Sequence, residues 1–201
     1  MDLTGRNIVL GVTGGIAAYK SAEIVSRLRH SGANVHVIMT KNAAEFVAPL
    51  TFQTLSANPV VTDTFSAPEK WNVEHVALAK LADIFVIAPA TANILAKMAN
   101  GIADDMLSTT VLATKAPVLA APAMNTGMWT AEATRANVET LKKRGVLFSG
   151  PDSRILACGD EGAGRMSEPA EIVRKIEEIL CREKDLQGLK ILVTAGATRG
   201  A

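Results

Sequence analysis

The stretch "NIVLGVTGGIAAYKS" at residues 7–21 joins an apolar run to a glycine turn and then to a segment of helical period. Many phosphate-binding α/β folds begin this way, because the turn leaves backbone N–H groups at a helix N-terminus. Further apolar runs lie at 34–40, 84–90, 118–123 and 146–150, and several are apolar at consecutive positions. Strands buried on both faces of a parallel sheet have this pattern. The sequence therefore predicts an α/β fold, a doubly wound parallel sheet in a Rossmann-like three-layer sandwich.

Helical periodicity fills the gaps between these runs. It predicts helices at 16–31, 43–55, 74–81, 92–100, 104–113 and 131–144. Gly32, Gly101 and Gly145 stand where helices commonly end. The segment "PDSRILACGDEGAGRMS" at 151–167 has no convincing period, so we expect a long functional loop there. An amphipathic helix is predicted directly after it, within 168–183.

Composition narrows the classes of function. The chain has 201 residues, enough for one main domain, and its 48% hydrophobic and 20% charged content is that of a globular protein. No run reaches the ~18 apolar residues that cross a bilayer. With a net charge of +1 and no long basic block, we expect no nucleic-acid partner. Two cysteines and an N-terminus "MDLTGRN" without signal-peptide features lead us to expect a cytoplasmic protein.

The glycine turn can be compared with three kinds of phosphate site. A P-loop has glycine before its lysine, but here Tyr19 holds that position. The dinucleotide fingerprint has glycine where this chain has Thr13 and Ile16, and an acidic residue where the second strand ends at Thr40. A site for a single phosphate at a helix N-terminus remains, with a tight turn that binds nothing as the alternative. Lys20, a turn into the helix, is expected on a solvated face.

Several side chains are candidates for chemistry. His75 begins a predicted helix, where it acts either in catalysis or as a helix-start residue. Cys158 lies in the glycine-rich segment and is either a reactive thiol or a small loop residue, whereas Cys181, at an amphipathic helix, is expected to pack. The adjacent carboxylates of Asp104 and Asp105 are best explained as helix N-caps. No cysteine and histidine have metal-ligand spacing, so no metal is expected.

Four segments together resemble one family. They are "GVTGGIAAYK" (11–20), the histidine of "NVEHVALAKLAD" (72–83), "PATANILAKMANGIADDML" (89–107) with "APAMNTGMW" (121–129), and "ACGDEGAGRM" (157–166). The chain resembles the flavin-containing cysteine decarboxylases, and most closely the decarboxylase domains of bifunctional coenzyme A biosynthesis proteins. By this resemblance, residues 1–186 form the decarboxylase domain and 187–201 begin a ligase domain. No ligase activity is expected, because this second domain is incomplete and its "AGATRGA" departs from the usual "AGPTRE".

The resemblance implies FMN as the cofactor and assigns residues to the site. The flavin-lining positions would be Gly14, Gly15, Ile16, Thr40, Thr91, Ala92, Asn93, Ile94 and Ala123. The catalytic residues would be His75, Asn125 and Cys158, in which Asn125 holds the substrate carboxylate and Cys158 donates a proton. Met124 and Ala157 would join Asn125 in binding the substrate.

The implied reaction is decarboxylation of 4′-phosphopantothenoylcysteine to 4′-phosphopantetheine. In this family the flavin oxidises the thiol carbon to a thioaldehyde, carbon dioxide leaves because C=S accepts the electrons, and the resulting enethiolate is protonated and reduced. The alternatives are an oxidative peptide-cysteine decarboxylase, or a flavoprotein that serves as a regulatory subunit without catalysis. The resemblance also implies homotrimers, which would pack into dodecamers in the full-length bifunctional protein.

Overall fold

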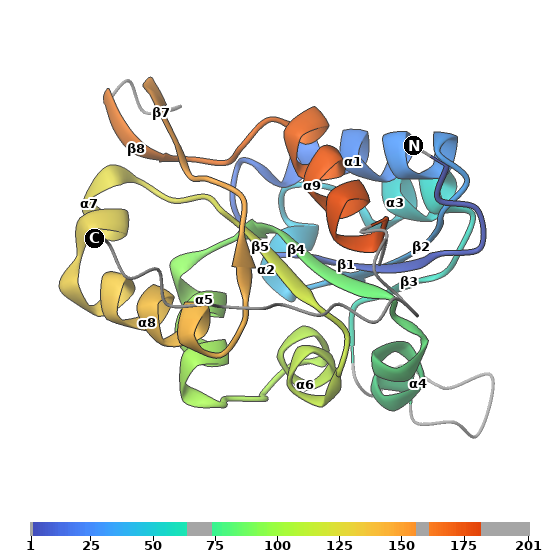
Figure 1. The fold of residues 1–201 in the computed structure, drawn as a ribbon, viewed down its shortest axis with the longest axis horizontal. Coiled ribbons are helices and arrows are strands. Elements are labelled where there is room, and N and C mark those ends of the chain that lie inside the picture. Colours follow the sequence, from blue (N-terminus) through green and yellow to red (C-terminus); the bar gives the residue numbers. More distant parts are fainter. Residues whose placement is uncertain (1, 64–73, 156–160, 182–201) are drawn as a thin grey trace, which may run out of the picture.

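The computed structural model describes residues 2–63, 74–155 and 161–181 (Figure 1). Its main sheet is parallel and has the strand order β3-β2-β1-β4-β5-β6. The strands are β1 (Asn7–Val12), β2 (Asn34–Met39), β3 (Val60–Val61), β4 (Ile84–Ala90), β5 (Val118–Pro122) and β6 (Leu147–Phe148). The chain extends from β1 first toward β3 and then, from β4, in the opposite direction. This order confirms the predicted doubly wound fold and places the topological switch point between β1 and β4.

Helices cover both faces of this sheet (Figure 1). One face carries α1 (Ala18–His30), α2 (Lys41–Ala44), α3 (Pro49–Ser56) and α9 (Pro169–Leu180). The other carries α4 (Glu74–Leu81), α5 (Ala92–Asn100), α6 (Met106–Ala113), α7 (Thr126–Thr130) and α8 (Glu132–Lys143). The three predicted layers are therefore present. Within the described residues, no helix is both long enough and apolar enough to span a bilayer.

Side chains along the central strand β1 alternate between the two faces of the sheet, and each face has its own hydrophobic cluster. Ile8 and Leu10 pack into the cluster under α1 and α9, whereas Val9 between them packs into the cluster under α5 and α6. Every residue of β4 is buried, which explains why its sequence is apolar without a period of two. Each fully buried side chain of this size contributes about 1.5–3 kcal/mol of transfer free energy.

One predicted helix differs from the structure. The span 43–55 is broken into α2 and α3, with Ala48 in an extended conformation and Pro49 in the first turn of α3. Proline disfavours helical dihedrals in the residue before it and has no N–H to donate, so the helix restarts there. The helix predicted at 131–144 is confirmed as α8, and the short helix α7 before it was not predicted. Gly32, Gly101 and Gly145 all follow helices with positive φ, as predicted.

The expected loop at 151–167 is largely regular. Strands β7 (Asp152–Ile155) and β8 (Glu161–Arg165) pair antiparallel as a second, two-stranded sheet. Glycine at 162 and 164 and the charged residues hide the period of two, so the sequence has no strand signal there. Residues 156–160 and 182–201 lie outside the described part of the chain, and with them Ala157, Cys158 and the predicted ligase start at 187–201.

Candidate active site

A cavity of about 640 Å³ opens at the carboxyl ends of β1, β2 and β4. Its walls are formed by Thr13, Gly14, Met39, Thr40, Lys41, Asn42, Thr62, Asp63, Thr91, Asn93, Ile94, Lys97, Asp104, Asp105, Met106 and Met128. Ligands of doubly wound sheets bind in this position, at the switch point of the strand order. The cavity is thus the main candidate for a binding site.

The glycine turn after β1 forms one wall. Thr13 is almost fully buried; its Oγ1 donates to the carbonyl of Pro89 at 2.7 Å and accepts the N–H of Thr91 at 3.3 Å. These two bonds join the end of β1 to the end of β4. A Cβ added to Gly14 would overlap the side chain and backbone of Asn42, whereas one added to Gly15 would have Thr91 Cγ2 as its nearest neighbour, at 3.9 Å. Close packing therefore requires glycine at 14, whereas a side chain at 15 would make only an ordinary contact with Thr91.

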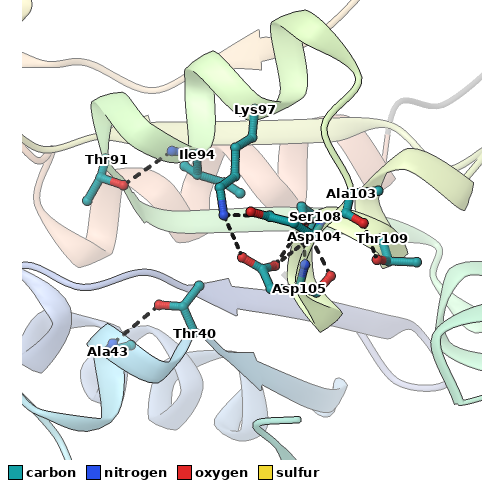
Figure 2. A network of polar contacts seen from close by, with 10 residues as sticks. All are labelled: Thr40, Ala43, Thr91, Ile94, Lys97, Ala103, Asp104, Asp105, Ser108 and Thr109. Atoms are coloured by element: carbon teal, nitrogen blue, oxygen red, sulfur yellow. Dashed lines mark hydrogen bonds and ion pairs between the residues drawn. The ribbon is translucent and has the colours of Figure 1, made fainter. Parts of the chain in front are cut away.

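Two helix N-termini meet the cavity, each capped by a threonine (Figure 2). Thr40 accepts the N–H of Ala43 at 3.2 Å, and Thr91 accepts the N–H of Ile94 at 3.4 Å. The N–H groups in the first turn of an α-helix have no partner within the helix and carry its positive dipole end. The N-terminus of α5 therefore offers donors to an anion in the cavity, and the phosphate of a mononucleotide fits this wall.

Next to the N-terminus of α5, a charged cluster of Lys97, Asp104 and Asp105 also lines the cavity (Figure 2). Lys97 Nζ lies 2.6 Å from Asp104 Oδ1 and 3.0 Å from Asp105 Oδ2, and the lysine side chain is only 17% exposed. Burial acts to lower the pKa of Lys97, but the hydrogen bonds to both carboxylates outweigh it and raise the pKa. Both carboxylates remain as acceptors, so this wall suits hydroxyl and N–H donors better than a phosphate.

Asp105 also begins helix α6. Its Oδ1 accepts the N–H of Ser108 at 2.8 Å, and Ser108 Oγ accepts the N–H of Asp105 at 3.1 Å, which together make a capping box. Burial acts to raise the pKa of Asp105, but the bonds from Ser108 and Lys97 prevail and lower it. The predicted N-cap is confirmed for Asp105, while Asp104 instead pairs with Lys97. Sequence reasoning missed that this cluster faces the cavity.

The segment after β5 carries Asn125, the N-cap of α7. Asn125 Oδ1 accepts the N–H of Met128 at 2.9 Å, and Met128 in turn lines the cavity. Because the oxygen serves the cap, the amide NH₂ is left as a donor, and it has no partner among the described residues. Met124 N–H donates to the carbonyl of Gly164 at 2.9 Å, and Ala123 N–H to that of Ala90 at 3.0 Å.

The other predicted site residues are placed as follows. Gly14, Thr40, Thr91, Asn93 and Ile94 line the cavity, whereas Gly15, Ile16, Ala92, Ala123, Met124 and Asn125 are outside its lining. Helix α4, which carries the half-buried His75, lies on the opposite side of the molecule from α7 (Figure 1). One chain thus does not bring His75 to Asn125.

Two expectations about polar residues can be compared with the structure. Lys20 does not lie on a solvated face: its side chain is only 11% exposed, and its Nζ pairs with Glu168 at 3.1 Å. The pairing was not predictable, because 148 residues separate the partners. Cys181 ends α9 and packs against the core, as expected. Within the described ranges, no three His, Cys, Asp or Glu side chains are grouped to hold a metal ion.

Comparisons with known proteins agree with this geometry. The coenzyme A biosynthesis bifunctional protein CoaBC of Haemophilus influenzae is 47% identical over 201 residues, which is 100% of this chain and 50% of that protein. The chain therefore spans about half the length of the curated relatives it matches.

Solved structures extend the likeness to the fold. A PPC decarboxylase variant with serine in place of a cysteine, complexed with pantothenoylaminoethenethiol, gives a TM-score of 0.78 at 31% identity and covers 86% of this chain and 96% of that one. The FMN-dependent cysteine decarboxylase SpaF gives 0.74 at 32% identity, covering 85% and 96%. A family model described as Flavoprotein matches residues 1–181. The chain therefore belongs to the flavoprotein family.

Proposed function

We propose that this chain binds FMN and decarboxylates 4′-phosphopantothenoylcysteine to 4′-phosphopantetheine, a step of coenzyme A biosynthesis. The observation that carries the proposal is the 47% identity to CoaBC over the entire chain. The fold match to PPC decarboxylase supports the same activity. The relative is bifunctional and twice as long, so the proposal concerns the decarboxylase alone, assigned to residues 1–186, with 187–201 as the beginning of a ligase domain.

The cavity fits a flavin mononucleotide. Gly14 and the N-terminus of α5 would hold the phosphate, since both present backbone to the cavity and Thr91 fixes the helix start. Thr40 and Asn93 add polar groups to the lining of the cavity. Gly15, Ile16, Ala92 and Ala123 are assigned to the flavin by the family resemblance. When bound, FMN supplies reversible hydride transfer at the thiol carbon of the substrate.

The residues of the chain would bind the substrate and move protons. The amide NH₂ of Asn125, which has no partner among the described residues, is a suitable donor to the substrate carboxylate, because the amide oxygen accepts the N–H of Met128. Cys158 is assigned as the proton donor to the enethiolate, and Ala157 and Met124 as neighbours of the substrate. His75 would assist at the thiol. These four assignments rest on the family resemblance.

The placement of His75 supports self-association. If His75 and Asn125 act in one site, a second copy of the chain must supply one of them, since α4 and α7 lie on opposite sides of one chain (Figure 1). Large apolar side chains are also exposed on the segments that follow the glycine turn and α2: Ile16 (64%), Tyr19 (60%), Phe46 (51%) and Leu50 (68%). Trimers with the flavin at the subunit boundary would explain both features, with dodecamers in a full-length bifunctional protein. We infer a cytoplasmic location, in keeping with the low cysteine content.

One experiment tests the proposal directly. The purified chain is reconstituted with FMN and incubated with 4′-phosphopantothenoylcysteine, and the product is identified by mass. We expect 4′-phosphopantetheine and a yellow protein. A product that has lost carbon dioxide but retains the oxidised enethiol would instead favour an oxidative peptide-cysteine decarboxylase, the alternative that the family resemblance leaves open. A protein that takes up no flavin would refute the proposal.

A further inference from the structure

Strand β8 lies against the segment that carries Asn125. The carbonyl of Gly164 accepts the N–H of Met124 at 2.9 Å. Gly164 has φ of +151°, and an added Cβ would overlap the carbonyl oxygen of Met124. Because the backbones of Gly164 and Met124 are in direct contact, a movement of β8 at Gly164 should also move Met124 and the next residue, Asn125.

The chain beyond Gly164 is fixed by an ion cluster of Lys20, Arg165 and Glu168. Both oxygens of the Glu168 carboxylate accept hydrogen bonds from Lys20 Nζ, at 3.1 and 3.2 Å, and Arg165 Nη2 donates to Oε1 at 2.8 Å. The hydrogen bond from Lys20 lowers the pKa of the Glu168 carboxyl. Met166 and Ser167, between the charged residues, are 1% and 0% exposed. The segment after β8 is therefore joined to α1 by the Lys20–Glu168 ion pair, and Met166 and Ser167 pack into the core.

The carboxylate of Glu168 does not cap the helix that it precedes. Glu168 is the N-cap residue of α9, yet its side chain makes no capping bond. An N-cap side chain that accepts a helix N–H typically contributes about 1 kcal/mol. Here the carboxylate instead joins α9 to α1, the helix that follows the glycine turn of the cavity. The cluster thus connects the two parts of the candidate site, the Gly14 turn and the Asn125 segment.

We propose that Glu168 is a positioning residue, which holds Lys20 and Arg165 so that Gly164 fixes the Met124–Asn125 backbone and aligns the Asn125 amide for the substrate. The inference rests on the proposed function for the role of Asn125. The structural coupling itself depends only on the contacts above. It can therefore be tested separately from activity.

The first test measures backbone protection by hydrogen exchange in the flavin-loaded chain. Glu168→Gln keeps the shape of the side chain and removes its charge. We expect the amides of residues 123–128 to exchange about tenfold faster in this variant, because local opening becomes easier. The matched control is Glu178→Gln, on the same helix, which removes an exposed carboxylate paired with Arg174. It should leave exchange at 123–128 unchanged.

The second test separates positioning from folding by kinetics. Glu168→Gln should lower kcat about tenfold through misalignment of the bound substrate, with normal flavin content and melting temperature. Glu168→Asp should recover part of the loss. Lys20→Gln should show part of the loss seen in Glu168→Gln, because it leaves the Arg165–Glu168 pair. The double variant should be no worse than Glu168→Gln alone, since the Lys20–Glu168 pair is already lost in that variant.

Two results would overturn the inference. One is exchange and kcat in Glu168→Gln that match Glu178→Gln. The other is a loss of kcat that only follows a loss of flavin and of melting temperature, which would make the ion cluster purely structural. If the wild-type chain binds flavin but does not turn over 4′-phosphopantothenoylcysteine, the proposed function fails. The exchange experiment then still decides whether Glu168 controls the Met124–Asn125 backbone.

Discussion

Asn125 accepts the backbone N–H of Met128 at 2.9 Å through its side-chain oxygen, and this bond begins helix α7. The two halves of the amide therefore have separate tasks. The oxygen holds the local fold, and the NH₂ group is available to a ligand. Because aspartate also caps helices well but has no N–H to donate, one substitution can separate the two tasks.

We predict that Asn125→Asp folds normally, binds FMN and loses decarboxylation by at least about a hundredfold. The second carboxylate would face the substrate carboxylate where a donor stood, and like charges repel. Melting temperature, flavin absorbance and product mass measure the three properties. Asn125→Ala is the companion variant, since it also removes the cap, at about 1 kcal/mol of stability. Undiminished turnover by Asn125→Asp would remove Asn125 from carboxylate binding.

The glycine turn offers a pair of matched substitutions. Gly14→Ala should destabilise the fold and abolish flavin binding, because its Cβ overlaps Asn42 at the start of α2. Overpacking of this kind typically costs about 1–3 kcal/mol. Gly15→Ala should leave the melting temperature of the flavin-free protein unchanged, since its Cβ would make only an ordinary 3.9 Å contact with Thr91 Cγ2. It should weaken FMN binding, because the family resemblance assigns position 15 to the flavin. Urea unfolding and fluorescence titration with FMN measure both. Equal flavin affinity in Gly15→Ala and wild type would exclude position 15 from the cofactor site.

The sequence predicted the fold well where one physical signal dominated. The strand at 84–90 was found with its exact bounds because burial on both faces makes β4 continuously apolar. The glycine turn was also correctly placed, because it directly follows the apolar run of β1. The hairpin β7–β8 was missed, since Gly162 and Gly164 carry no side chain to alternate. Glycine at 164 is required by contact with Met124, which is a tertiary constraint.

The site was less predictable because it is assembled from distant contacts. Lys97 and Asp105 are eight residues apart and on different helices, and they meet because the chain reverses after Gly101, which has a left-handed conformation. Sequence reasoning recognised the cap at Asp105 but had no means to see its partner. Lys20 and Glu168 illustrate the same limit over a longer separation.

The pairing of Lys97 with Asp105 predicts a pH-dependent contribution to stability. Asp105→Asn keeps the oxygen that caps α6 and removes the charge. We expect wild type to be more stable than this variant by at most about 1 kcal/mol at neutral pH, because the pair is partly exposed to solvent. Urea unfolding of both proteins across the pH range measures the difference.

The direction of the pH effect follows from the two pKa shifts. The pKa of Asp105 is lowered by folding, so its contribution is complete above its unfolded pKa of about 3.9 and disappears as the pH falls through the lower folded value. The pKa of Lys97 is raised, so its contribution is complete below about 10.4 and disappears as the pH rises through the higher folded value. The difference in free energy of unfolding between wild type and Asp105→Asn should thus be constant from about pH 5 to 9. A difference that persists undiminished at about pH 3 would mean that shape, and not charge, is responsible.

A shared active site can be tested by mixing two inactive chains. His75→Asn and Asn125→Asp should each be inactive alone. If His75 of one copy works with Asn125 of another, co-expression with two different tags and tandem purification should give mixed trimers in which about a third of the sites have both native residues. Such trimers should recover about a third of wild-type turnover. Co-expression of His75→Asn with itself under both tags is the control, and it should stay inactive. If each site were built within one chain, every chain in the mixture would carry a defect, so the absence of any recovered turnover in mixed oligomers of normal flavin content would refute a shared site.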